Sequence, residues 1–240
     1  MSNTPCSLPD ASAFGRDAFS PLPRLIVTDV DSTLIAQEVI EELAHFAGTR
    51  QQVADITARA MNGEIDFAES LRLRVSTLAG VPATVFDEVL HSITPTPGVR
   101  DLIDAVHAHG GFFGVVSGGF EEVVSPLCHQ LNIDHYLANR LEVTNGFLTG
   151  KVLGAIVTAD AKVQALEEWR LLHGLDVNQT VAIGDGANDI PMLQRAGVGI
   201  AFCAKPTVRE QVKYSLNVAQ LDLLIEPLGL SGGSSHLSAH

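Results

Sequence analysis

The sequence has few cysteines and no long hydrophobic run. Its three cysteines, Cys6, Cys128 and Cys203, are far apart and match neither a zinc-binding spacing nor a disulfide framework. This usage suits a reducing compartment, and we expect the protein in the cytoplasm. No run of about 18 apolar residues is present, and the N-terminus lacks a basic segment followed by an apolar one. We therefore expect no membrane span and no signal peptide.

Positive charge is also scarce. The 240 residues include 15 Lys and Arg against 28 Asp and Glu, a formal net charge of −13. Such a chain repels nucleic-acid phosphates, so we expect no nucleic-acid partner. The same field repels a small anion. Any phosphate site therefore needs local positive potential from a metal ion, a lysine or backbone N–H groups.

Apolar residues make up 46% of the chain, which is enough for a large hydrophobic core. Short apolar runs alternate with helical patterns, which predicts an α/β fold with a doubly wound, Rossmann-like parallel sheet. The predicted strands are 25–28, 112–116, 181–183 and 198–201. The predicted helices are 99–109, 120–131, 161–173 and 188–196.

Two segments depart from simple alternation. Residues 37–95 are helical in pattern and too long for a crossover, so we predict an inserted helical cap domain that could close over a site. Asn145-Gly146 separates two strand-like runs, 140–144 and 147–149, and predicts a β-hairpin. We predict a loose N-terminal extension over residues 1–22 and a flexible tail over 231–240. The core domain comprises 23–36 and 96–230, and the cap domain comprises 37–95.

The most informative segment is Leu25–Leu34, in which an apolar run ends at Asp29 and Asp31, followed by Ser and Thr. Ligands of open α/β sheets bind at such strand ends. Two carboxylates there suit a hard cation and a phosphoryl group, with one aspartate as nucleophile and the other moving a proton. By itself the segment also fits a polar strand-to-loop turn.

Three further segments carry polar groups in similar places. Ser117-Gly118-Gly119 ends a predicted strand and precedes a helix, which suits an anion site or a simple turn. Asp185, Asn188 and Asp189 follow another strand among glycines and could complete a Mg²⁺ site or cap a helix. Lys162 opens a predicted helix, where a solvated surface charge is the usual role.

Asp, Ser, Lys and Asp thus occur in this order at strand ends or helix starts, which resembles the haloacid dehalogenase (HAD) superfamily of phosphohydrolases. The chain is also similar to the phosphoserine phosphatases of that superfamily over about residues 24–228. A HAD-like fold is therefore expected. The resemblance rests on the segments Ala60–Val75, Ile93–Gly98, Val115–Phe120, Ala138–Leu141, Leu148–Gly150, Gly184–Ile190 and Ala201–Pro206.

The resemblance implies a role for each matched residue of the core. Asp29 is the nucleophile that becomes an aspartyl-phosphate, and Asp31 is the general acid and then the base. Mg²⁺ is held by Asp29, the Asp31 backbone carbonyl and Asp185, with Asp189 supporting the metal and the lysine without direct coordination. The phosphate ligands are Ser117, Gly118 and Lys162, oriented with help from Asn188.

The cap residues imply the substrate. By the resemblance, Glu38 faces the substrate ammonium and Arg74 its carboxylate, while Met61 and Phe67 shield the closed site. A guanidinium suits a carboxylate because it can bind with two parallel hydrogen bonds. Thr33 and Gln37 are expected at the entrance. Glu38 and Arg74, taken without this context, would be exposed helix charges.

The implied activity is Mg²⁺-dependent hydrolysis of O-phospho-L-serine to L-serine and phosphate, the last step of serine biosynthesis. Three alternatives stay open. The enzyme could transfer the phosphoryl group to an alcohol such as homoserine, or hydrolyse another small phosphomonoester. A regulatory module with a phosphorylatable aspartate is the third. We expect a small-molecule substrate, no membrane partner, and a chain compatible with a homodimer.

Overall fold

The computed structural model describes residues 22–61 and 64–232. The predicted N-terminal extension and tail lie almost entirely outside these residues. Among the described residues, no helix is both long and apolar enough to cross a membrane. The elements are, in chain order, β1 Leu25–Asp29, the turn η2 Val30–Leu34, α1 Val39–Ala47, α2 Arg50–Met61, α3 Phe67–Ser76, α4 Val85–Ser92, α5 Val99–Ala108, β2 Phe112–Phe120, α6 Glu121–Leu131, β3 His135–Thr144, β4 Phe147–Leu153, α7 Ala159–Leu172, η3 Val177–Gln179, β5 Thr180–Gly184, η4 Ala187–Asp189, α8 Ile190–Arg195, β6 Val198–Phe202, α9 Pro206–Arg209, β7 Tyr214–Leu216 and η5 Leu221–Leu224.

The predicted α/β fold is confirmed. Seven strands form one sheet in the order β4-β3-β2-β1-β5-β6-β7, and only β4 runs antiparallel to its neighbour. The chain leaves β1 towards β2 and later crosses to β5 on the other side of β1. The order of the strands therefore reverses at β1, which is where open α/β sheets bind ligands, beyond the carboxyl ends of the strands.

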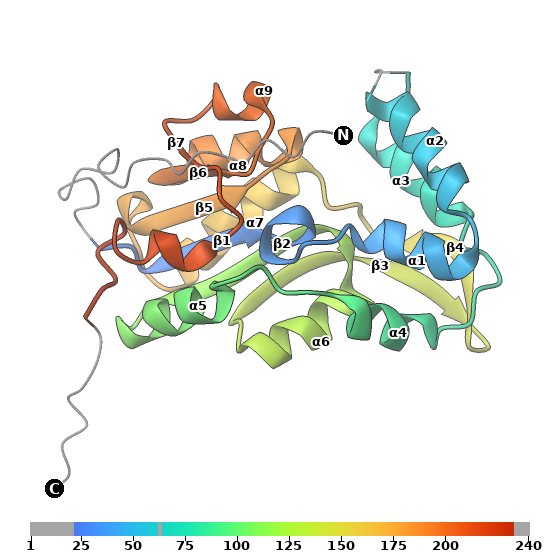
Figure 1. Cartoon of the computed structure of the whole chain (residues 1–240), viewed down its shortest axis with the longest axis horizontal. Helices are drawn as coiled ribbons and strands as arrows, with labels where there is room; N and C mark the ends of the chain where they lie inside the picture. Colours follow the sequence, from blue (N-terminus) through green and yellow to red (C-terminus); the bar gives the residue numbers. More distant parts are fainter. Residues whose placement is uncertain (1–21, 62–63, 233–240) are drawn as a thin grey trace, which may run out of the picture.

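Helices cover both faces of the sheet (Figure 1). Buried side chains of α5 and α6 belong to the larger apolar cluster, and those of α7 and α8 to a second one. In β1, Ile26 joins the first cluster while Leu25 and Val27 join the second, as the two-residue period of a strand requires. Asp29 continues the row of Leu25 and Val27, so its side chain points to the face covered by α7.

The described part of segment 37–95 contains the helices α1 to α4, joined by turns and short irregular stretches, in place of a simple crossover. In Figure 1, α2 and α3 stand as a pair beside the sheet, whereas α1 and α4 lie along it. Leu43 of α1, Val75 of α3 and Val89 of α4 all belong to the larger apolar cluster of the core. The helices of this segment therefore share their apolar contacts with the sheet and its helices.

Some boundaries differ from the predictions. β2 runs on to Phe120 instead of ending at 116, and β3 begins at His135, where it pairs in parallel with β2 before turning into the hairpin. The predicted helix 188–196 is divided into η4 and α8, whose second residue is Pro191. The edge strand β7 has three residues, too few for an apolar pattern, and was not predicted.

Candidate active site

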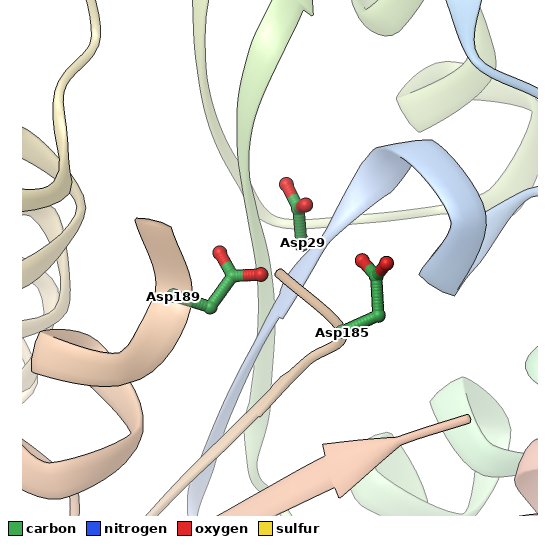
Figure 2. Close-up of side chains that lie close together, drawn as sticks. All are labelled: Asp29, Asp185 and Asp189. Atoms are coloured by element: carbon green, nitrogen blue, oxygen red, sulfur yellow. The ribbon is translucent and has the colours of Figure 1, made fainter. Parts of the chain in front are cut away.

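Three neighbouring strands carry polar residues at or just beyond the carboxyl edge of the sheet. Asp29 closes β1 and pairs with Val116 of β2, so the next residue of β2, Ser117, lies beside it. Thr28 pairs with Ile183 of β5, which places Asp185 just past the same edge. Figure 2 shows the carboxylates of Asp29, Asp185 and Asp189 gathered around this point. The strand ends that the sequence singled out are thus brought together.

Lys162 lies beneath this cluster as a buried cation. Its Nζ donates to Asp29 Oδ1 at 2.8 Å and to Asp189 Oδ1 at 2.7 Å. The Lys162 side chain is 1% exposed, so it is not the solvated surface charge that a single lysine on a helix usually is. Asp189 also accepts from the Gly186 N–H at 2.9 Å through its other oxygen. Both Asp189 oxygens are therefore engaged by the protein.

The crowding of carboxylates changes their pKa values. Burial, together with Asp189, raises the pKa of Asp29 from 3.8 to about 7, although Lys162 opposes the shift. Burial and Asp189 likewise raise the pKa of Asp185 to about 6. Burial alone would lower the pKa of Lys162, but Asp29 and Asp189 raise it overall. The lysine is thus positively charged, and the carboxylates gain from a second nearby cation.

Asp31 lies in the turn η2 and is not one of the two carboxylates that accept from Lys162. Burial, then Glu38 and Asp29, raise the pKa of Asp31 well above its ordinary value. Its Oδ1 is buried and accepts no hydrogen bond from the described residues. A carboxyl with a raised pKa beside a pocket suits the role of a general acid, which donates a proton to a leaving group.

The segment Ser117–Gly119 forms a bulge in β2. The register with β3 shifts between Val116 and Phe120. Ser117 Oγ accepts from the Gly119 N–H at 2.8 Å, so the hydroxyl proton is available for another acceptor. A Cβ on Gly119 would lie 3.3 Å from Asp31 Oδ2 and 3.0 Å from Ser117 Oγ, so a side chain there would crowd both groups.

A pocket of about 180 Å³ opens above these groups. Its volume is below the range typical of drug-sized ligands, which points to a small metabolite. The side of the pocket formed by residues 38–74 contributes Glu38, Phe67 and Arg74. Ser117, Lys162 and Asp189 are buried and do not themselves line the pocket. The complete lining is Asp29, Asp31, Glu38, Ile40, Phe67, Leu71, Arg74, Gly118, Gly119, Asp185, Gly186 and Asn188.

Glu38 and Arg74 give this pocket one acidic and one basic group. Ser32 Oγ donates to Glu38 Oε1 at 2.7 Å, from a backbone with φ of +57° that places Ser32 in the left-handed region. Burial raises the pKa of Glu38, and burial lowers the pKa of Arg74 while Glu38 and Asp31 oppose that change. A pocket with separate acidic and basic groups suits a zwitterion that carries both an ammonium and a carboxylate.

Two further residues differ from their expected places. Thr33 does not line the entrance: it is fully buried, and its Oγ1 donates to Asp185 Oδ1 at 3.2 Å. Gln37 is hydrogen-bonded to the segment that follows α4: its Oε1 accepts from the Thr94 N–H at 3.0 Å. Neither residue lines the pocket. Met61 ends α2, and its side chain lies outside the described residues.

The acidic cluster has the donors that Mg²⁺ prefers. One carboxylate oxygen from each of Asp29, Asp185 and Asp189 lies within 4.8 Å of the others, and all the donors are oxygen. Lys162 and Gly186 already occupy Asp189, which leaves Asp29 and Asp185 as the side chains better able to hold an ion. Burial raises the pKa values of these two residues first and the neighbouring Asp189 raises them further, and a bound divalent cation would favour their ionised forms.

Comparison with known proteins places the chain in a family. The family model of haloacid dehalogenase-like hydrolases matches residues 26–194. The chain belongs to this family. The HAD-family match covers β1 from Ile26 onward, the helical segment 37–95 and the sheet as far as α8, so it includes every part of the site described above.

Individual relatives within the HAD family are also close. A phosphoserine phosphatase of Streptococcus thermophilus is 50% identical over 209 residues, which is 87% of this chain and 97% of the relative. Phosphoserine phosphatase SerB2 of Mycobacterium tuberculosis is 51% identical, but the alignment spans 88% of this chain and only 51% of that protein. A structure of a phospho-aspartyl intermediate analogue of phosphoserine phosphatase superposes with a TM-score of 0.80 at 40% identity, covering 85% of this chain and 98% of the other.

Proposed function

We propose that this protein is a phosphoserine phosphatase that hydrolyses O-phospho-L-serine to L-serine and phosphate. The observation that carries the proposal is a single pocket containing Asp29, Asp31, Glu38 and Arg74, with Lys162 beneath it. The first two residues and the lysine suit phosphoryl transfer. The acidic and basic pair suits the amino acid that carries the phosphate. The names of the relatives described above agree with this reading.

In the proposed first step, an Asp29 oxygen attacks phosphorus while the bond from phosphorus to the serine oxygen breaks. Asp31 gives its proton to that oxygen, so serine leaves as an alcohol and Asp29 carries the phosphoryl group. In the second step Asp31 takes a proton from water, whose oxygen attacks phosphorus. The bond to Asp29 breaks, and inorganic phosphate is released.

Charge on the phosphoryl oxygens needs fixed positive partners. Lys162 supplies one, and the hydroxyl of Ser117 with the backbone around Gly118 supplies hydrogen-bond donors. Asp29, Asp185 and the Asp31 carbonyl would hold Mg²⁺, with Asp189 keeping Lys162 in place. Bound there, Mg²⁺ would neutralise part of the charge on the phosphoryl group. Asn188 at the rim would orient the phosphate.

In the cap segment (residues 37–95), Glu38 would accept from the substrate ammonium and Arg74 would donate to its carboxylate. Phe67 would cover the phosphate loop, because a Cβ on Gly118 would lie 3.3 Å from Phe67 Cζ. A wider cleft leads to this point between α2–α3 and the start of α7, lined in part by Thr57, Phe67 and Thr158. Closing that cleft would exclude water from the site. Met61 is proposed to take part in this cover.

The proposal extends to the oligomeric state, the partners and the location of the protein. All the site residues named above come from one chain, so a homodimer would not be needed to complete the site. The substrate is a small metabolite, and we propose a cytoplasmic enzyme with no nucleic-acid partner, consistent with the acidic charge of the chain.

Arg74→Ala tests the specificity part of the proposal. The substitution removes a charge-assisted contact to the substrate carboxylate, so kcat/KM for O-phospho-L-serine should fall roughly 10–100-fold. Hydrolysis of an aryl phosphate, which lacks that carboxylate, should fall much less. Arg72→Ala is the matched control, because Arg72 is exposed on the same helix. Equal losses on both substrates would refute the carboxylate role of Arg74.

A further inference from the structure

Asn139 is a buried residue of β3 that the proposed mechanism does not use. The residue is 1% exposed, and its side chain bonds to two parts of the site. The Nδ2 donates to the Gly118 carbonyl at 2.9 Å, and the Oδ1 accepts from the Val157 N–H at 2.8 Å. The orientation of the amide is unambiguous, since only the nitrogen can donate to a carbonyl and only the oxygen can accept from an N–H.

The bulge in β2 explains why a side chain is needed at this position. Between the pairs Val116–Leu137 and Phe120–Asn139, the chain advances four residues along β2 but two along β3. The extra residues of β2 have no backbone partners opposite them in the β2–β3 ladder. The Asn139 amide replaces the missing ladder bond at Gly118.

The contact with Gly118 sets the direction of a peptide group beside the pocket. With the Gly118 carbonyl held by Asn139, the N–H of the same peptide, that of Gly119, donates to Ser117 Oγ at 2.8 Å. Ser117 Oγ already accepts one proton, so its own proton is free to face the pocket. A Gly118 carbonyl turned towards the pocket would instead present a partial negative charge to an anion.

The other end of the amide reaches the segment that carries Lys162. Val157 directly precedes Thr158, the residue that caps the N-terminus of α7, and the Lys162 N–H donates to the Thr158 carbonyl at 3.1 Å. One side chain therefore links the bulge at Ser117–Gly119 to the start of the helix bearing the lysine. These are the two parts of the site assigned to phosphate oxygens.

We infer that Asn139 is a positioning residue for phosphate binding, which acts by holding the Gly118 peptide and the start of α7 in register with each other. The inference rests on the proposed function, because it takes the bulge and Lys162 as the phosphate site. Asn139 does not touch the substrate. Its effect appears in the affinity of the site for a phosphate group, whatever alcohol that group is attached to.

The test measures the inhibition constant of inorganic phosphate, with Mg²⁺ present, for full-length wild-type protein and for Asn139→Asp and Asn139→Ser. Asn139→Asp keeps the shape and the acceptor for Val157 but turns a carboxylate oxygen towards the Gly118 carbonyl. Asn139→Ser shortens the side chain so that it no longer spans both partners. We expect the inhibition constant and the KM for O-phospho-L-serine to rise about tenfold or more in both variants.

Thr149→Val is the matched control. It removes the 2.6 Å hydrogen bond from Thr149 Oγ1 to Glu142 Oε2 in the same hairpin, away from the bulge. This variant should keep phosphate affinity within about twofold of wild type even if it loses thermal stability. Circular dichroism and melting temperatures establish that each variant is folded under the assay conditions.

Three results would overturn the inference. The first is that folded Asn139 variants bind phosphate as tightly as wild type does. The second is that the Thr149→Val control loses phosphate affinity to the same extent. The third is that both Asn139 variants fail to fold, which would assign the residue to the fold alone. The proposed function fails separately. It fails if wild type neither releases phosphate from O-phospho-L-serine nor binds inorganic phosphate.

Discussion

At the scale of the residue, Asp29 combines burial, a lysine partner and neighbouring carboxylates in one side chain. Lys162 binds one of its oxygens at 2.8 Å, which orients the carboxylate at the carboxyl end of β1. The same lysine places a positive charge beside a carboxylate that lines the pocket. This arrangement costs stability, because several acidic groups share a buried space. Such a cost is typical of a site selected for chemistry.

Replacing the proposed nucleophile gives a direct prediction. Asp29→Asn keeps the shape of the side chain but cannot form an aspartyl-phosphate, so turnover of O-phospho-L-serine should fall by about 10⁴-fold or more. Asp160→Asn, on the exposed first turn of α7, should leave turnover unchanged. Substantial activity in folded Asp29→Asn would remove Asp29 from the mechanism.

The carboxylates also predict how Mg²⁺ and pH act together. Because the pKa values of Asp29 and Asp185 are raised from 3.8 to about 7 and about 6, the folded, metal-free protein binds protons more tightly than the unfolded chain. Their contribution to stability is therefore fully present below about pH 4 and is lost as the pH rises through 6 to 7. A metal ion needs the ionised carboxylates, so its affinity rises over the same window.

We therefore expect the increase in melting temperature caused by Mg²⁺ to be larger at about pH 8 than at about pH 5.5. Thermal melts with and without Mg²⁺ at the two pH values measure this difference. The double substitution Asp29→Asn with Asp185→Asn should abolish the metal-dependent increase. An increase that does not depend on pH would show that these carboxylates do not hold the ion.

At this scale, sequence patterns pointed to several residues that the structure brings together in the candidate site, but they did not predict all of its contacts. Asp29, Ser117 and Asp185 each follow an apolar run within one or two residues, so the predicted strand ends point to them. Lys162 required the family resemblance, because one lysine on a helix carries no pattern of its own. The contacts of Ser32, Thr33 and Asn139 were not predicted, since each depends on a turn or bulge geometry that local sequence does not specify.

At the scale of the element, the predicted hairpin at Asn145-Gly146 and the main parallel strands are confirmed. Both have strong local signals: a turn that needs positive φ, and apolar runs of β-branched residues. The bulge in β2 and the parallel start of β3 were not predicted, because both depend on pairing between residues that are far apart in the sequence. The strand β7 was missed because three residues give no period to recognise.

The start of α5 gives a prediction about packing between elements. Gly98 has φ of +77°, and a Cβ there would lie 2.5 Å from the backbone nitrogen of Asp222 in η5. Gly80 has φ of +84° but no atom within 4 Å of an added Cβ. Gly80→Ala should therefore cost only the backbone strain, roughly 1–2 kcal/mol. Gly98→Ala should cost about 1–3 kcal/mol more through overpacking.

Urea unfolding of both variants measures these differences in the free energy of unfolding. The Gly98 and Gly80 positions form a matched pair, because both residues are glycines with a left-handed backbone. Equal destabilisation would mean that η5 moves aside and does not pack firmly against the start of α5.

At the scale of the whole molecule, the helices α1, α3 and α4 share one apolar cluster with the core. Leu43, Val75 and Val89 are buried together with residues of α5 and α6. A cap with a separate apolar core could unfold alone, but a shared cluster couples it to the sheet. The division into core and cap domains, made from helical pattern alone, stays a prediction about motion at the site.

We expect a single calorimetric unfolding transition for the metal-free protein, with equal calorimetric and van't Hoff enthalpies. Far-ultraviolet circular dichroism and tryptophan fluorescence should report the same midpoint, since Trp169 lies on α7, outside the cap segment, and packs against the second apolar cluster. Two separated transitions would show that the cap segment unfolds independently despite the shared cluster.

The central claim is that one pocket joins phosphoryl transfer to recognition of an amino acid. The most direct measurement is phosphate release from O-phospho-L-serine with Mg²⁺, with EDTA, and with homoserine as a competing acceptor. The account predicts release that requires Mg²⁺ and is unaffected by homoserine. Loss of free phosphate with formation of phosphohomoserine would make the protein a transferase. No turnover of O-phospho-L-serine, with turnover of an aryl phosphate, would contradict the assignment of Glu38 and Arg74.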